Sequence, residues 1–158
     1  MRKYQSSRGW RNNNPLNIRK GEKWIGLVEK PTDNEFCQFI SMSFGYRAAY
    51  KILKSYARYF RQRGKDCTIR NILERWAPPS ENDTETYIVR VCDILVASPF
   101  YTIDPGRCAF EDRHTAWLMA AMTCVECGCE PQSVNYKAII GGIMLGGGHE
   151  LKLEDVEL

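Results

Sequence analysis

Apolar residues recur at steps of three and four along most of the chain, which is the spacing of amphipathic helices. A first helix is expected over residues 46–60 and ends near Gly64. A second begins after Thr68 and stops before Pro78. Three more follow: one that ends before Pro99, one over residues 112–127 and one over residues 135–145. The pattern predicts a mainly α-helical protein.

The N-terminal part of the chain follows a different pattern. Short apolar pieces between residues 16 and 40 are separated by Gly21 and by the Pro-Thr-Asp-Asn segment at residues 31–34. This predicts a small antiparallel β region that is too short to form the core. We expect one α+β domain over residues 1–150, dominated by helices, and an acidic, flexible tail over residues 151–158.

Composition excludes several classes of protein. The 158 residues are 44% hydrophobic, enough for one compact core, and the net charge of +3 does not demand a nucleic-acid partner. No stretch approaches about 18 consecutive apolar residues, and no apolar run follows the first charged residues. We therefore expect no signal peptide and no membrane span. A product made in the bacterial cytoplasm would reach the cell wall through lysis, particle assembly or specialised export.

Glu126 is the carboxylate with the strongest case for chemistry. It stands in the last turn of the helix predicted over residues 112–127, just before Gly128. On a helical projection it lies at the edge of the apolar arc, between Met119 and Met122. Burial at that position raises a carboxyl pKa toward the range useful for a general acid that protonates a sugar leaving group. The alternative is a solvated Glu near a helix end.

An asparagine-rich segment near the N-terminus has the chemistry of a saccharide site. Asparagine amides offer a donor and an acceptor to hydroxyl and acetamido groups, and a tryptophan face can stack on a pyranose ring. The alternative is that the asparagines only cap and turn a tight loop before Pro15. The expected saccharide-binding residues of this segment are Asn13, Asn14, Asn17, Arg19 and Trp24.

A second acidic segment precedes the third predicted helix. Glu81 or Asp83 can supply the other carboxylate of a glycosidase pair, with Tyr87 one turn later hydrogen-bonding the substrate. The same kinds of residue also cap helices, as Ser80, Asn82 or Asp83 would do here. Glu81 is the expected second catalytic residue.

Seven cysteines, an odd number without a secretion signal, favour free thiols over a disulfide framework. A small helical protein that binds zinc, or binds nucleic acid through the basic residues 51–65, is an alternative, although a second paired C-x-x-C is missing. The zinc ligands would come from Cys108, His114, Cys124, Cys127 and Cys129. The favoured interpretation needs no metal or organic cofactor.

Four motifs carry a resemblance to a known family. R-N-N-N-P-L-N-I-R, W-I-G-L, G-Y-R-A and W-A-P-P-S-E-N-D-T stand at residues 11–19, 24–27, 45–48 and 76–84. The chain resembles small phage and prophage proteins of gut bacteria, often labelled virion structural proteins, over most of residues 8–96. That resemblance implies a phage virion or injection-apparatus component.

Partial resemblances imply an activity. Residues 12–60 and 82–91 are similar to flagellar-type glucosaminidases, in which a tyrosine matching Tyr87 lies near the substrate. The segment M-A-A-M-T-C-V-E-C-G-C-E-P at residues 119–131 is similar to the helix that holds the catalytic acid in lysozyme-like lytic transglycosylases. In place of the serine of that family's E-S-G motif, this chain has Cys127.

The order of the two parts differs from that in these enzymes, where the acid-bearing helix precedes the asparagine turn. A circular permutation of a lysozyme-like fold would reconcile the order. The resemblance then implies a hydrolase of the peptidoglycan glycan strand, with Glu126 as general acid and Glu81 as second carboxylate. A non-catalytic phage component that binds wall glycan or partner proteins is the alternative.

Overall fold

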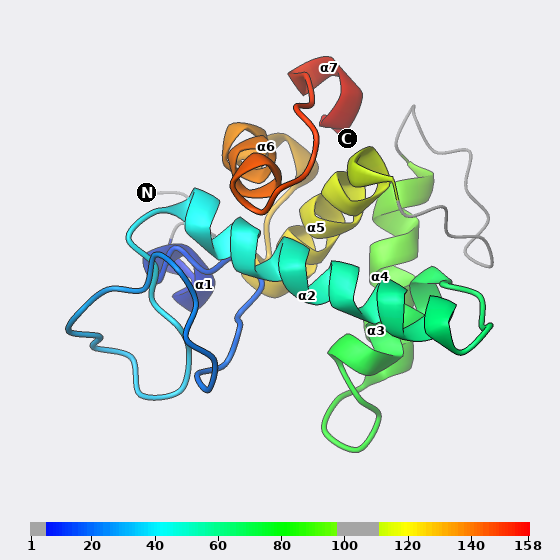
Figure 1. Ribbon diagram of the computed structural model, residues 1–158, viewed down its shortest axis with the longest axis horizontal. Helices are drawn as coiled ribbons and strands as arrows, with labels where there is room; N and C mark the ends of the chain where they lie inside the picture. Colours follow the sequence, from blue (N-terminus) through cyan, green and yellow to red (C-terminus); the bar gives the residue numbers. More distant parts are fainter. Residues whose placement is uncertain (1–5, 98–110) are drawn as a thin grey trace.

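The computed structural model describes residues 6–97 and 111–158, and the fold is mostly helical, as predicted (Figure 1). Between the third and fourth predicted helices the sequence indicates a loop at residues 99–107, and this segment and Cys108 lie outside the described residues. Among the described residues, no helix has both the length and the apolar character needed to cross a membrane. The elements are α1 (Arg8–Arg11), α2 (Met42–Gln62), α3 (Ile69–Trp76), α4 (Thr84–Val96), α5 (Asp112–Cys127), η2 (Pro131–Ser133), α6 (Tyr136–Leu145) and α7 (Leu153–Val156).

Helix α5 runs through the centre of the core. Every residue from 116 to 122 is at most 7% exposed, so this helix is covered on all sides. Helix α2 packs along α6, and α4 packs against α5. In Figure 1, α2 crosses in front of α5. Helices α3 and α4 lie near one end of α2, and α6 lies near its other end. The end of α5 is thereby brought next to the N-terminal segment, which contacts it through α1.

Local sequence signals set most helix ends. Thr68 caps α3, and Gly128 ends α5 in the left-handed conformation, with a φ of 66°. The boundaries predicted for α5 are confirmed. Helix α4 is capped by Asp83 rather than by Ser80 or Asn82, because the Asp83 carboxylate accepts a hydrogen bond from an amide of the first turn.

The small antiparallel β region does not form strands. Two isolated antiparallel bridges, Arg19 with Phe36 and Leu27 with Phe39, are what the described residues show of it. The side-chain amide of Asn14 donates to two backbone carbonyls of these segments, at 2.9 and 3.0 Å. The Ile18 carbonyl also accepts the Cys37 amide at 2.9 Å, so side-chain and backbone hydrogen bonds together hold this irregular segment.

The C-terminal segment packs on the domain instead of extending as a flexible tail. Val156 of α7 is 0% exposed, and α7 contacts both α5 and α6. The Trp117 indole N–H donates to the Asp155 carbonyl at 2.8 Å, and the Leu158 amide donates to the Tyr136 hydroxyl at 3.2 Å. Acidic composition indicated a solvated tail, but a few apolar and backbone contacts are enough to dock so short a segment.

Candidate active site

An open cleft lies where the N-terminal turn meets the helices. It has a volume of about 390 Å³ and is bounded by residues 16–19, α2, the segment that joins α3 to α4, and the end of α5. The acid near the end of the chain and the turn near its beginning therefore share one cleft. The predicted site residues that line it are Asn17, Arg19, Glu81, Tyr87 and Glu126.

Two hydrogen-bond donors hold the carboxylate of Glu126. The Asn17 amide donates to Oε2 at 2.9 Å, and the Tyr87 hydroxyl donates to Oε1 at 3.1 Å. The Trp76 side chain, which lines the same cleft, also acts to lower the pKa of this carboxylate. Burial raises the pKa of Glu126, while Asn17, Tyr87 and Trp76 oppose the rise because they stabilise the charged form. The net pKa is raised, so Glu126 keeps its proton at higher pH than an exposed glutamate does.

The position of Asn17 depends on a tight turn. Asn13 and Asn17 both adopt the left-handed conformation, with φ of 51° and 52°, which asparagine tolerates better than most residues. Gly9 packs closely against the turn, and a Cβ there would lie 2.9 Å from Asn17 Oδ1. The Cys127 thiol donates to the Pro15 carbonyl at 3.4 Å, which joins the end of α5 to this turn.

Asn13, Asn14 and Trp24 do not line the cleft. Asn14 is fully buried, and its side chain bonds the backbone of Ile18 and Cys37. The Asn13 side-chain amide likewise donates to a backbone carbonyl, at 3.0 Å. The buried indole N–H of Trp24 has no hydrogen-bond partner within the described chain. The two asparagines support the turn, as the alternative interpretation of this segment has it, and none of the three belongs to the proposed substrate site.

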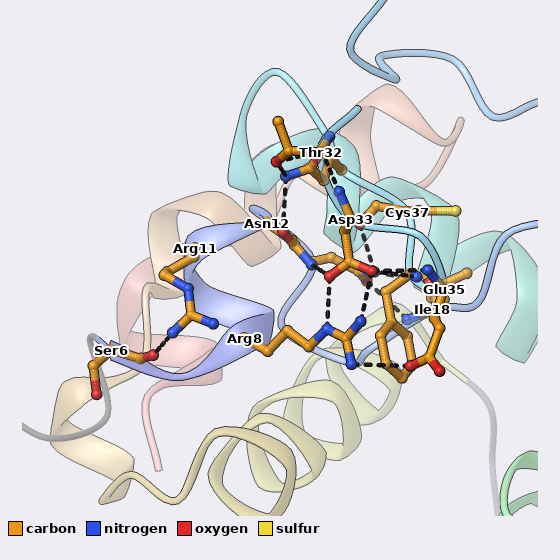
Figure 2. Close-up of polar contacts among 12 residues, drawn as sticks. Ser6, Arg8, Arg11, Asn12, Ile18, Thr32, Asp33, Glu35 and Cys37 are labelled. Atoms are coloured by element: carbon orange, nitrogen blue, oxygen red, sulfur yellow. Dashed lines mark hydrogen bonds and ion pairs between the residues drawn. The ribbon is translucent and has the colours of Figure 1, made fainter. Parts of the chain in front are cut away.

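A network around Asp33 fixes α1 to the loop that follows the turn (Figure 2). The Arg8 guanidinium donates to both oxygens of the Asp33 carboxylate, at 2.6 and 2.8 Å, and to Glu35 at 3.0 Å. The Asn12 amide and two backbone amides also donate to Asp33, each at 2.9 Å. These donors, Arg8 first among them, hold the pKa of Asp33 well below its usual range. From the sequence, Asp33 was only one residue of an expected turn.

Glu81 and Arg19 extend the polar part of the cleft. Glu81 is exposed, lies between α3 and α4, and has no ion-pair partner within the described residues. The Arg19 guanidinium lies over the Phe36 ring, 5.0 Å from its centroid. The cleft therefore offers a free carboxylate and a cation in addition to the protected acid.

Trp76 and Tyr56 also line the cleft, although the sequence pattern did not identify them as site residues. The helical pattern assigned Trp76 to the buried face of its helix, but it is only half-buried and reaches Glu126. The Ala-Pro-Pro sequence after Trp76 could have identified it, because the prolines end α3 and leave Trp76 as its last residue. Tyr56 had no comparable signal, because it belongs to a regular helical repeat.

The thiols do not form a metal site in the part of the chain that the structure describes. No group of three His, Cys, Asp or Glu side chains there fits a metal ion. Cys127 is buried and engaged with the Pro15 carbonyl. Cys108, one of the zinc ligands considered, lies outside the described residues.

Known proteins add a phage context. No family model matches the chain. The chain is 43% identical over 88 residues to Protein P5 of Pseudoalteromonas phage PM2. The match covers 53% of this chain and 52% of Protein P5, so the chain matches about half the length of this curated relative. The chain is therefore similar to a phage protein.

Proposed function

We propose that this protein is a phage-encoded hydrolase of the peptidoglycan glycan strand in which Glu126 acts as general acid. The observation that carries the proposal is the hydrogen bond between Asn17 and Glu126, which joins residues 109 positions apart inside an open cleft. A carboxyl of raised pKa in a cleft with room for sugar rings is what a glycosidase requires. The similarity to Protein P5 supports the phage context.

Glu126 would protonate the glycosidic oxygen as its bond to the anomeric carbon breaks. The proton then stays with the leaving sugar as a hydroxyl hydrogen, and Glu126 becomes a carboxylate. Asn17 and Tyr87 already point their donors at the two carboxylate oxygens. They stabilise the negative charge that develops on the acid without any rearrangement of the protein.

The attack on the anomeric carbon has two chemical routes. Glu81 can act as a base that activates a water molecule, which is the two-carboxylate mechanism. Alternatively, the acetamido or 6-hydroxyl group of the substrate attacks, and Glu126 works as the single protein acid. Glu81→Gln separates the two routes, because it abolishes activity under the first and only reduces it under the second.

Substrate recognition would rest on the other residues that line the cleft. The rings of Phe36, Tyr56 and Trp76 line the cleft and offer apolar faces for sugar rings. Arg19 and Asn82 line it with polar groups suited to hydroxyl and acetamido oxygens. The expected ligand is thus an uncharged sugar backbone with polar substituents.

The proposed fold is a lysozyme-like helical domain over residues 1–150 with a circularly permuted order of its parts. Support comes from helix α5, whose acid-bearing end lies against the asparagine turn. The protein would act at the cell wall after lysis, particle assembly or specialised export.

The test is the release of soluble muropeptides from purified peptidoglycan. We expect Glu126→Gln to lower release by about a hundredfold or more, since general acid catalysis contributes roughly 10²–10⁴ in rate. Glu130→Gln is the matched control, because it removes an exposed carboxylate close to the same helix end and leaves release unchanged. Equal release by the wild type and Glu126→Gln, or no release by either folded protein, contradicts the proposal.

The similarity to Protein P5 is also compatible with a second function, that of a phage component which binds wall glycan or partner proteins without cleaving them. A wild-type protein that sediments with peptidoglycan but releases no muropeptides supports this second function over the first.

A further inference from the structure

Beside the cleft, tyrosine rings of α2 stack with the guanidinium groups of its C-cap residue and of an arginine in α3. We call these residues the Arg75 cluster: Tyr56, Tyr59, Arg63 and Arg75. The Arg75 guanidinium lies 5.2 Å from the centroid of the Tyr56 ring and 4.0 Å from that of Tyr59. The Arg63 guanidinium lies 3.6 Å from the Tyr59 centroid. Stacking of this kind holds the plane of a guanidinium and leaves its N–H edges available for hydrogen bonds.

The Arg75 cluster is continuous with the cleft. Tyr56 belongs to both, because it lines the cleft and its ring contacts Arg75. Trp76, the next residue after Arg75, lines the cleft and acts on the pKa of Glu126. A substituent that projects from a ligand in the cleft therefore lies within reach of the Arg75 guanidinium.

The Arg75 cluster carries two cations and no acid. Within the described chain, neither Arg63 nor Arg75 forms an ion pair. Arg70 on the same helix differs, because it pairs with Glu74 and Glu85. A guanidinium that is exposed, unpaired and held in its plane is preorganised for the two oxygens of a carboxylate.

We propose that Arg75 binds a carboxylate of the peptide stem while the glycan strand that carries this stem lies in the cleft. The inference rests on the proposed function and adds the peptide stem to the sugar rings that the cleft would hold. Peptide stems project sideways from the glycan and carry carboxylates, so a fixed guanidinium beside the sugar site meets them. The cluster would make the protein prefer stem-bearing glycan to an uncharged polysaccharide.

The experiment compares two ligands on protein in which Glu126→Gln prevents turnover. One ligand is the peptidoglycan disaccharide with its tetrapeptide, and the other is the same molecule with the peptide carboxyl groups converted to amides. Calorimetry gives both dissociation constants. We expect the added Arg75→Gln change to weaken binding of the acidic ligand roughly fivefold to tenfold, as for a charge-assisted pair at a partly exposed site, and to leave the amidated ligand unchanged. Arg75→Lys keeps the charge but not the planar fork, and should weaken binding to an intermediate extent.

Arg58→Gln is the matched control, because it removes the same charge from an exposed position of α2 outside the Arg75 cluster. It should leave both dissociation constants unchanged. If both ligands bind and Arg75→Gln affects neither, or weakens both equally, the carboxylate site is wrong and the proposed function stands. If the folded protein binds neither ligand, both the proposed function and this inference are wrong.

Discussion

Replacing Tyr87 by Phe should move the pH dependence of glycan cleavage toward higher pH. The change removes only the hydroxyl that donates to Glu126 Oε1 at 3.1 Å. This hydrogen bond lowers the pKa of Glu126, so its loss leaves the pKa further above the ordinary value. Glu126 then keeps its proton at higher pH, and the basic limb of the activity profile moves in the same direction.

The size of the effect follows from the kind of bond that is lost. A hydrogen bond to a charged group contributes about 1.5–3 kcal/mol, and the lower end applies because Asn17 still donates to the carboxylate. A difference of about 1.4 kcal/mol changes the ratio of two protonation states tenfold. On the basic limb, the Tyr87→Phe protein should therefore hold roughly ten times more of its Glu126 in the protonated form.

The assay is the initial rate of muropeptide release as a function of pH. Tyr56→Phe is the matched control, since Tyr56 lines the same cleft and has no hydrogen bond to Glu126. Its basic limb should stay where the wild type has it. Thermal melts at each pH separate ionisation from unfolding. A basic limb that stays in place, or moves to lower pH, in folded Tyr87→Phe protein would refute the assignment of Glu126 as an acid held by Tyr87.

Three further substitutions test the surroundings of the site. Gly9→Ala should cost about 1–3 kcal/mol of stability and slow cleavage, because its Cβ would lie 2.9 Å from Asn17 Oδ1. Denaturant unfolding measures the stability, and the initial rate of muropeptide release measures cleavage. An unchanged rate contradicts the role of the turn. Asp33→Asn should destabilise the protein at neutral pH. The Asp33 carboxylate contributes stability above the ordinary aspartate pKa, and this contribution is lost as pH falls through its lowered pKa in the folded state. The difference between the denaturant midpoints of the wild type and Asp33→Asn should therefore become smaller in acid. A difference that does not change with pH contradicts this role of Asp33. Val156→Ala should lower the free energy of unfolding by about 2 kcal/mol, since the side chain is 0% exposed; no measurable loss would mean that α7 does not dock.

The helices could be predicted because their signals are local. The apolar period of α5 and the glycine after it set both boundaries, and Thr68 marked the start of α3. The small β region was predicted from the same kind of pattern, but the described residues show two isolated bridges there, and the Asn14 side-chain amide adds to the backbone hydrogen bonds of the segment. A pattern of apolar residues does not show whether such short pieces will pair over enough residues to form strands.

The site could be predicted only in part, because its contacts join distant residues. The sequence pointed to both Asn17 and Glu126, but it did not distinguish Asn17 from Asn13 and Asn14 as a saccharide-binding residue. Their roles differ because the turn has no regular period, so one side chain faces the cleft while Asn14 is buried. Asp33 acquires its importance from Arg8, 25 residues earlier, a pairing that no local motif marks.

The central claim, that Glu126 drives cleavage of the glycan backbone, is tested most directly by identifying the chain ends formed in purified peptidoglycan strands. Mass spectrometry of the digest distinguishes new sugar ends, whether reducing or anhydro, from newly cut peptide bonds. We predict new sugar ends with the wild type, none with folded Glu126→Gln protein, and intact peptides with both. Sugar ends that form equally well without the Glu126 carboxyl, or a folded wild-type protein that forms none, would contradict the claim.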